Sequence, residues 1–272
     1  MQNQRTLVMG ILNITPDSFA DGGRHYSMED ALARATMMID EGVDIIDIGG
    51  ESTKPGSERI TEAEEERRVL PVLAKLVESK VQISIDTTRA AIAKKAIDLG
   101  VHYVNDVSGG LADEAMYGLI ASHPKVQYII MHWRGHSKNM QELAKYDDVV
   151  REVREELEAR IDAAIEAGVN PDQIIIDPGI GFSKLPEHNW ELLRNLDRLA
   201  ILGYPILIGA SRKRFLGELV GANDPEQRES ASIAVTAMVA KQRVWGVRTH
   251  SIKPHRDAIA TVEAMQRDKV EK

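Results

Sequence analysis

The sequence contains no cysteine, and it lacks other features that mark particular classes of protein. Without cysteine, disulfides, thiolate zinc sites and cysteine nucleophiles are excluded. No apolar run reaches the roughly 18 residues that a membrane-spanning helix needs. The first residues also lack the basic, apolar and small-residue succession of a signal peptide, so we expect a cytoplasmic protein.

An excess of positive charge is absent as well. The formal net charge is −8 and the pI is about 5.6, so binding of nucleic acid through a basic surface is not expected. A few local basic residues remain sufficient to hold an anionic substrate. The remaining composition, 43% hydrophobic and 28% charged over 272 residues, is typical of a globular protein.

Short runs rich in Val and Ile alternate with longer amphipathic stretches. We predict strands at residues 7–13, 43–49, 81–88, 102–107, 126–133, 173–179, 204–210 and 244–250. Helices are predicted at 28–41, 61–79, 89–99, 113–122, 143–167, 187–202, 225–241 and 254–267. Repeated strand–helix units indicate parallel pairing, and this pattern predicts an α/β fold, a (β/α)8 TIM barrel in a single domain over residues 1–272. An open doubly wound sheet is the alternative, but regular units without a large insertion favour closure.

Polar side chains stand where the predicted strands end, and in a barrel these ends carry the chemistry. Asp86 and Asp177 lie within apolar runs, where a carboxylate needs a hydrogen-bonding or cationic partner. Strand ends are in any case wetter than strand centres, which is a sufficient explanation for any one such residue. The set fits a flat heterocycle with ring nitrogens and an amino group, because a carboxylate can accept two parallel N–H bonds. Its members are Asn13, Asp86, Asn105 and Asp177.

A basic cluster follows the seventh and eighth predicted strands. The stretch GASRKRFLG (209–217) places Lys213 where a strand meets the start of a helix. Loops in this part of a barrel often bind phosphate, and a helix N-terminus assists with its backbone N–H groups. Arg248 and His250 alternate along the eighth strand and therefore face the same side. We predict functional roles for Lys213, Arg248 and His250.

Other polar segments have simpler explanations. Charges are often merely exposed, so we expect Arg212 and Arg214 to lie on a solvated surface. DPGIGFSK (177–184) contains Pro and Gly at turn positions. Phe182 within it is either a wall for a planar ligand or a packing residue, and His132 either lines the barrel mouth or is packed elsewhere.

A long polar loop follows the first predicted strand, over residues 13–26. Loops of this length are uncommon in compact domains and often act as lids. No HExxH or similar ligand spacing occurs, so a metal caged by the protein is not expected. A hard cation held mainly by phosphates would leave a single protein ligand such as Asn13.

These segments resemble the dihydropteroate synthases, the folate-pathway enzymes that sulfonamides inhibit. The resemblance covers about residues 6–262. It rests on motifs in matching order and spacing: NITPDSFADGG (13–23), DIGGEST (47–53), SIDTT (84–88), NDVSG (105–109), MH (131–132), DPGIGF (177–182) and GASRKRFLG (209–217).

The resemblance implies a barrel that joins 6-hydroxymethyl-7,8-dihydropterin diphosphate to p-aminobenzoate, requires Mg²⁺ and forms a homodimer. Pterin binding is implied for Asp86, Asn105, Met131, Asp177, Phe182, Gly209 and Lys213. Diphosphate binding is implied for Asn13, Arg248 and His250, with Asn13 as the metal ligand. The p-aminobenzoate site is implied for Thr15, Pro16, Phe19, Thr53, Lys54 and Ser211. The catalytic groups would be Lys213, Asp86, Arg248 and His250.

The implied chemistry is consistent with the residues. Diphosphate leaves from a carbon attached to an electron-rich ring, so a cationic pterin intermediate is expected, with Asp86 and Asp177 offsetting its charge. Loops 13–26 and 50–58 would close over the site and exclude water. Two positions depart from the family pattern. Lys54 stands where the family usually has Arg, and Ser251 stands where it usually has Asp.

Two alternatives remain open on the sequence. A pterin-binding methyltransferase that moves a methyl group to a corrinoid would use the same Asp86, Asn105 and Asp177. A catalytically silent relative that only binds pterins is the other. Lys213 and the NITPDSF loop favour the synthase, whereas Lys54 and Ser251 keep the silent relative open.

Overall fold

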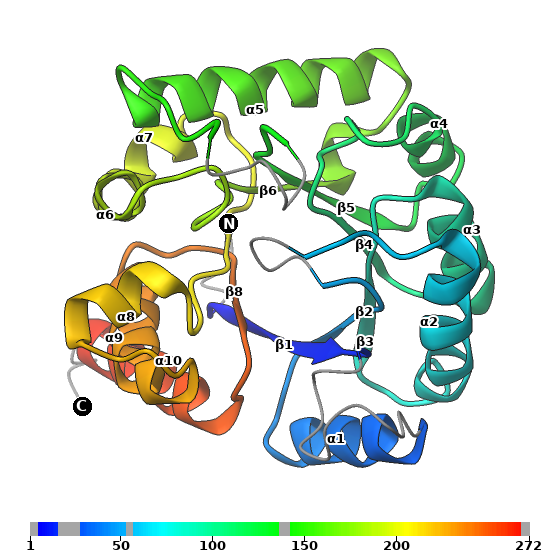
Figure 1. Ribbon diagram of the computed structural model, residues 1–272, viewed down its shortest axis with the longest axis horizontal. Helices are drawn as coiled ribbons and strands as arrows, with labels where there is room; N and C mark the ends of the chain where they lie inside the picture. Colours follow the sequence, from blue (N-terminus) through cyan, green and yellow to red (C-terminus); the bar gives the residue numbers. More distant parts are fainter. Residues whose placement is uncertain (1–4, 16–27, 53–56, 136–141, 268–272) are drawn as a thin grey trace.

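Eight parallel strands form the centre of the molecule, and helices surround them (Figure 1). The computed structural model describes residues 5–15, 28–52, 57–135 and 142–267. The strands are β1 (Leu7–Asn13), β2 (Ile45–Gly49), β3 (Gln82–Asp86), β4 (Tyr103–Asp106), β5 (Gln127–Met131), β6 (Ile174–Asp177), β7 (Leu207–Ile208) and β8 (Gly246–Thr249). Neighbours follow the order β6-β5-β4-β3-β2-β1-β8-β7, and a parallel bridge from Ile176 to Ile206 joins the two ends. The predicted (β/α)8 barrel is confirmed.

The strands are apolar on both faces because one face of each strand lines the barrel interior and the other packs against the surrounding helices. One set of side chains fills the barrel interior: Met9, Ile45, Tyr103, Ile129, Ile175 and Leu207. The alternate residues, such as Val8, Ile46 and Ile130, belong to the larger cluster that also includes side chains of the helices. A parallel sheet covered on both faces requires such continuous Val- and Ile-rich runs, which is why the strands were predictable.

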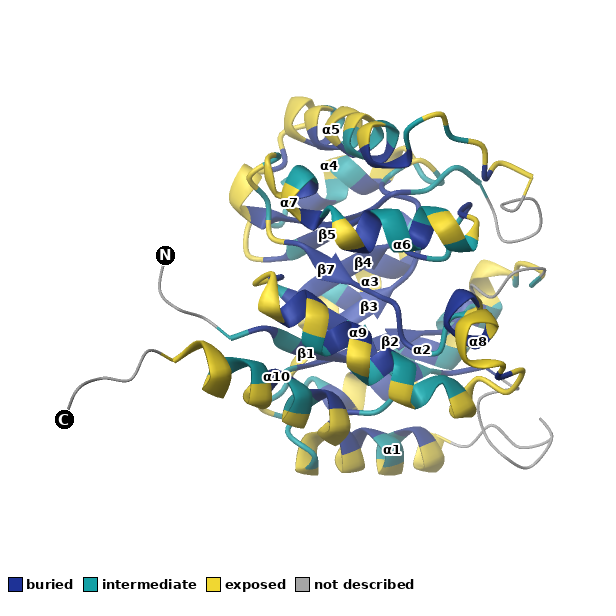
Figure 2. Cartoon of the chain, turned by 90° about the vertical axis from the view of Figure 1, so that its left-hand side faces the viewer, coloured by how far each residue is buried: buried dark blue, intermediate teal, exposed yellow. Residues whose placement is uncertain are grey.

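The helices cover the barrel and expose their outer faces, which Figure 2 shows in yellow around the buried strands. They are α1 (Met28–Asp40), α2 (Glu62–Leu76), α3 (Ala90–Leu99), α4 (Ala115–Ala121), α5 (Val149–Glu166), α6 (Pro186–Arg194), α7 (Leu196–Ala200), α8 (Arg214–Val220), α9 (Glu229–Lys241) and α10 (Lys253–Gln266). Within the described residues, none of these helices is long and apolar enough to cross a membrane.

Three helical predictions differ from the structure. The helix expected from residue 143 begins only at Val149, because the Asp148 side chain caps it by accepting from the N–H of Arg151 at 2.9 Å. The helix expected at 187–202 is two helices that meet at Asn195. Helix α8 begins at Arg214, where the start of a helix was predicted after the seventh strand, but no range had been predicted for it.

Strand register decides which polar residues face the barrel interior. Asp86 pairs with Gly49 on one side and with Asn105 on the other. Met131 pairs with Asp177, and Arg248 pairs with Met9, whose side chain belongs to the interior cluster. Side chains alternate along a strand, so the polar residues of these pairs point into the barrel, on the same side of the sheet as the interior cluster.

Candidate active site

A salt-bridge network links the inward-facing acids of β2 and β3 to the arginine of β8. Arg248 donates from Nε to Oδ2 of Asp47 at 2.6 Å and from Nη2 to Oδ2 of Asp86 at 2.6 Å. Asn105 donates from Nδ2 to the same Asp47 oxygen at 2.9 Å. Asp47 is fully buried, and Asp86 and Asn105 are nearly so. The structure therefore brings together Asp86, Asn105 and Arg248, as predicted, and adds Asp47.

Burial and neighbouring charges shift the pKa values of Asp86 and Arg248. Burial raises the pKa of Asp86 to about 7, and the nearby Arg248 charge opposes this shift. Burial also tends to lower the pKa of Arg248, but the two carboxylates outweigh it, so that the pKa lies above its ordinary value. The guanidinium is thus a permanent cation held between two buried acids.

Asp177 and Lys213 are two further charged groups next to this network, and each shifts the pKa of the other. Oδ1 of Asp177 accepts from the backbone N–H of Gly179 at 2.7 Å. Burial raises the pKa of Asp177, whereas the charge of Lys213 lowers it. Burial lowers the pKa of Lys213 to about 8, although Asp177 acts in the other direction. A Cβ on Gly209 would lie 3.7 Å from Oδ2 of Asp177 and 3.9 Å from Nζ of Lys213, so Gly209 is directly beside both charged groups.

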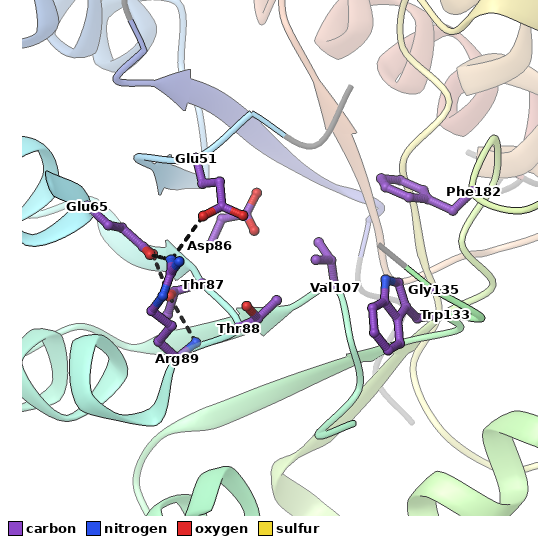
Figure 3. Close-up of a pocket in the computed structure, with 10 residues that line it drawn as sticks. All are labelled: Glu51, Glu65, Asp86, Thr87, Thr88, Arg89, Val107, Trp133, Gly135 and Phe182. Carbon is purple, nitrogen blue, oxygen red and sulfur yellow. Dashed lines mark hydrogen bonds and ion pairs between the residues drawn. The ribbon is translucent and has the colours of Figure 1, made fainter. Parts of the chain in front are cut away.

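Phe182 lies beside the lysine of this pair. Nζ of Lys213 is 4.5 Å from the centre of the Phe182 ring and donates to the carbonyl of Ile180. Phe182 and Asp86 also line one pocket together with Glu51, Thr88, Arg89 and Trp133 (Figure 3). Phe182 is half-buried, with the Lys213 ammonium beside its ring and a pocket that it helps to line, so the wall role and the packing role are both compatible with its position.

The residues that follow β7 and β8 are tied together. Ser211 Oγ lies 3.1 Å from Nδ1 of His250 and accepts from the His250 backbone N–H at 3.3 Å. Burial and the neighbouring Arg212 charge lower the pKa of His250 to about 3. His250 is therefore a neutral imidazole at physiological pH in the ligand-free chain, able to donate or accept a hydrogen bond.

The start of α9 supports this pair. The Glu229 carboxylate accepts from Arg212 Nε at 2.7 Å and from Ser251 Oγ, and its Oε1 lies 3.1 Å from Nε2 of His255. Ser251, where the family usually has Asp, is thus hydrogen-bonded. The solvated position predicted for Arg214 is confirmed, because its side chain is 86% exposed. The same prediction for Arg212 is wrong, because Glu229 holds it and its side chain is 24% exposed.

The remaining predicted residues divide into two groups. Asn13 ends β1, Met131 ends β5 with 4% exposure, and Thr15 is buried. Pro16, Phe19, Thr53 and Lys54 lie outside the described residues. Among the described residues, no three His, Cys, Asp or Glu side chains are grouped so as to hold a metal ion.

Two buried residues were not predicted as part of the site. Asp47 stands at the end of a predicted strand, but only the fold reveals its contact with Arg248, which is 201 positions away. Lys184 is 3% exposed and lies 2.9 Å from His132. The signal that was available for both is a charged residue within or next to an apolar run.

Comparison with known proteins identifies relatives of this chain. The family described as pterin binding enzyme matches residues 9–250. A dihydropteroate synthase of Mycobacterium leprae is 46% identical over 263 residues, covering 94% of this chain and 92% of that protein. The structure of Xanthomonas albilineans dihydropteroate synthase with 4-aminobenzoic acid has a TM-score of 0.91 at 40% identity, covering 97% of this chain and 94% of the other. The same enzyme in complex with 7,8-dihydropteroate has a TM-score of 0.88 at 38% identity, covering 97% and 95%.

Proposed function

The chain belongs to the pterin binding enzyme family, as a dihydropteroate synthase, and we propose how its own residues carry out that reaction. The enzyme is a transferase of folate biosynthesis. It joins 6-hydroxymethyl-7,8-dihydropterin diphosphate to p-aminobenzoate and releases 7,8-dihydropteroate and diphosphate. The observation that carries the residue assignment is the inward-facing group of Asp86, Asn105 and Asp177 beside Lys213.

The pterin ring lies among these polar groups in our proposal. Asp177 and Asp86 accept N–H bonds from the pyrimidinone edge and the ring nitrogens, and the Asn105 amide supplies both a donor and an acceptor. Lys213, which lies near Asp177, donates to ring acceptors. Phe182 and Met131 contact the faces of the ring, and Gly209 leaves room for it.

The chemical step breaks the carbon–oxygen bond to the diphosphate. The bond breaks with its electron pair going to the diphosphate, and the positive charge that develops on the pterin is offset by Asp86 and Asp177. The amine nitrogen of p-aminobenzoate then forms a bond to the same carbon and loses a proton to water or to the released diphosphate. Ser211 and Thr15 contribute to the amine site among the described residues.

The leaving diphosphate is received by Arg248 and His250. The hydrogen bonds from Arg248 to described residues use Nε and Nη2, so we assign Nη1 to the diphosphate. His250 contributes as a neutral hydrogen-bonding group, because its pKa is lowered to about 3 before substrate binds.

Magnesium, dimerisation and location are also proposed. Asn13 offers an amide oxygen at the end of β1, which fits a hard cation whose other ligands are phosphate oxygens. Mg²⁺ bound there would neutralise part of the diphosphate charge.

We propose a homodimer that covers exposed Leu219, Met238 and Met265, which are 66%, 63% and 82% exposed on α8, α9 and α10. A cytoplasmic location is proposed as well. Sedimentation and cell fractionation test these last two proposals.

One set of parallel incubations tests this function. Purified protein is mixed with pterin diphosphate, labelled p-aminobenzoate and Mg²⁺, with parallel samples containing EDTA or a methyl-donor folate and a corrinoid. Dihydropteroate formation that EDTA abolishes supports the proposal. Corrinoid methylation would instead indicate a methyltransferase, and pterin binding without turnover would indicate a silent relative.

A further inference from the structure

The loop from Asp177 to Lys184 has backbone carbonyls capped by three different side chains. The carbonyl of Ile180 accepts from Nζ of Lys213, that of Phe182 from Nζ of Lys184 at 3.0 Å, and that of Ser183 from the Tyr146 hydroxyl at 2.9 Å. Lys213 and Tyr146 come from other parts of the chain, whereas Lys184 belongs to the loop itself and reaches back two residues. The loop that presents Phe182 is therefore held from several directions.

The loop needs this support because its backbone is unusual. Gly179 and Gly181 have φ of 66° and 81°, and Ser183 has φ of 48° although it is not glycine. A non-glycine residue in the left-handed region carries strain and persists when its surroundings fix it. A side chain on Gly181 would come within 2.8 Å of Lys213, which shows how closely this loop approaches the site.

Lys184 is the most deeply placed of the donors that the proposed reaction does not use. It is 3% exposed, and its Nζ also lies 2.9 Å from Nδ1 of His132. The pKa of Glu156 is lowered to about 2, so its carboxylate can only accept a hydrogen bond; Nε2 of His132 therefore carries the ring proton, and Nδ1 accepts from Lys184. Nε2 then donates to Oε2 of Glu156 at 2.9 Å. A chain of hydrogen bonds thus runs from Glu156 on α5 through His132 and Lys184 to the Phe182 carbonyl.

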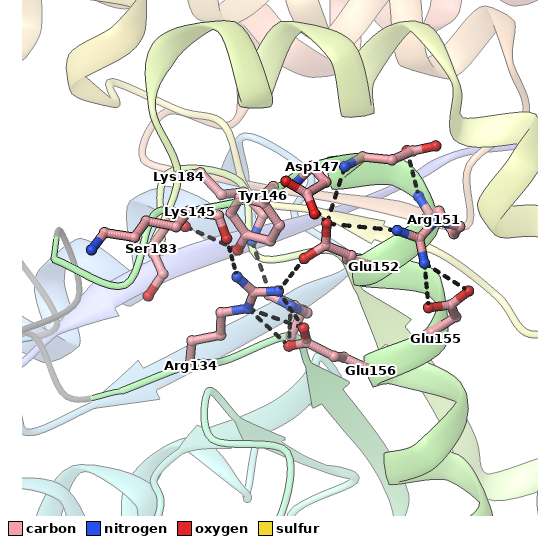
Figure 4. A network of polar contacts seen from close by, with 12 residues as sticks. Arg134, Lys145, Tyr146, Asp147, Arg151, Glu152, Glu155, Glu156, Ser183 and Lys184 are labelled. Atoms are coloured by element: carbon pink, nitrogen blue, oxygen red, sulfur yellow. Dashed lines mark hydrogen bonds and ion pairs between the residues drawn. The ribbon is translucent and has the colours of Figure 1, made fainter.

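The outer end of this chain is fixed by four residues, which we call the Arg134 cluster: Arg134, Tyr146, Glu152 and Glu156. Arg134 donates from Nε to Glu156 at 3.0 Å and from Nη2 to Glu152 at 2.9 Å, and it stacks over the Tyr146 ring at 3.8 Å. Figure 4 shows these side chains beside Ser183 and Lys184. Two of the three carbonyl donors, Lys184 and Tyr146, are therefore anchored to the same cluster.

We propose that Lys184 is a positioning residue for pterin binding, holding the Phe182 loop in register with the α5 side of the barrel. The inference rests on the proposed function, because it takes the ligand beside Phe182 to be a pterin. Lys184 acts through the Phe182 carbonyl and does not contact the substrate. Its loss leaves buried Nδ1 of His132 and the partly buried Phe182 carbonyl without their donor and allows the strained loop to relax, so the ring wall shifts.

The test compares Lys184→Met with Lys145→Met, which removes an exposed lysine from the same region. The probe is 6-hydroxymethylpterin, whose binding is measured by calorimetry without turnover. We expect Lys184→Met to raise the pterin Kd about tenfold and to raise KM for the pterin substrate while leaving KM for p-aminobenzoate unchanged. Lys145→Met should bind as the unmodified chain does. A change in KM for the pterin substrate alone indicates a positioning role, whereas a general loss of structure would change both KM values.

Tyr146→Phe provides a second route if Lys184→Met does not fold, because it removes only the hydroxyl that caps Ser183. We expect the pterin Kd to rise a few-fold, roughly threefold. If the folded variant binds pterin within experimental error of the unmodified chain, the proposal is overturned. If the unmodified chain itself fails to bind pterin, the proposed ligand is wrong and this inference falls with it.

Discussion

Removal of the Arg248 cation tests the electrostatic description of the site most severely. In Arg248→Gln, Asp47 and Asp86 lose bonds of 2.6 Å to a guanidinium that neutralises both. Asp47 is fully buried, Asp86 is 7% exposed, and the Arg248 side chain is 17% exposed, so solvent cannot replace the lost charge. We therefore expect the variant to be unstable as well as inactive.

The expected loss of unfolding free energy in Arg248→Gln follows from the burial of these groups. Removing one partner of a buried ion pair costs about 3–5 kcal/mol, because an uncompensated charge is left behind. For a domain of this size, that loss lowers Tm by roughly 6–20 °C. Urea denaturation gives the free energy of unfolding, and activity with both substrates should fall in parallel.

The pH dependence of this deficit has a definite sign. The pKa of Asp86 in the folded chain, raised to about 7, exceeds its unfolded value of about 3.9. Protonation of Asp86 therefore favours the folded state, and stability from this group is lost as pH rises through about 7. Without Arg248 the pKa rises further, so the deficit of the variant should be larger at high pH than at low pH.

A double variant separates charge from packing. Adding Asp86→Asn to Arg248→Gln removes one of the unpaired carboxylates, and we expect it to restore about 1–3 kcal/mol relative to additivity. Asp86→Asn alone is the matched control, since Arg248 keeps Asp47. If the two effects add with no coupling and the deficit does not change with pH, the ion-pair description of this site is refuted.

The other predictions concern the pterin and diphosphate ends of the site. Asp177→Asn should weaken binding of 6-hydroxymethylpterin by about tenfold or more in calorimetry, because the charged acceptor is lost, and a normal Kd would contradict its assignment. Lys213→Ala should remove most turnover while the chain stays folded by circular dichroism. In the unmodified enzyme, kcat/KM should fall as pH rises through about 8, where Lys213 loses its charge, and a flat profile would argue against a charged role. Ser251→Ala removes the hydrogen bond to Glu229 and should raise KM for pterin diphosphate about fivefold with little change in Tm, whereas an unchanged KM would show that the bond is dispensable.

The barrel was predictable because its strands need Val- and Ile-rich runs on both faces, and such runs are visible in sequence. Only the start of helix α8 was predictable, since its seven residues include Gly217 and are too short to show a reliable period. The surrounding chain packs closely against this helix, because a side chain on Gly217 would clash with the Ala222 carbonyl. Tertiary packing, which a local pattern does not contain, fixes this element.

Site residues at strand ends were predictable for a similar reason. Asp86, Asn105 and Asp177 interrupt apolar runs, and a buried polar group announces a partner or a ligand. The partners themselves were not predictable. Arg248 meets Asp47 across 201 positions and Lys184 meets His132 across 52, and only the closed sheet brings them together.

The central claim is that the acids at the strand ends bind the pterin ring while the groups after β7 and β8 receive the diphosphate. A crystal structure of this enzyme with 6-hydroxymethylpterin and diphosphate tests it most directly. The account predicts the ring hydrogen-bonded to Asp177, Asp86 and Asn105, with the diphosphate against Arg248 and His250. A ring bound elsewhere, or an Asp177 side chain turned away from it, would contradict the account.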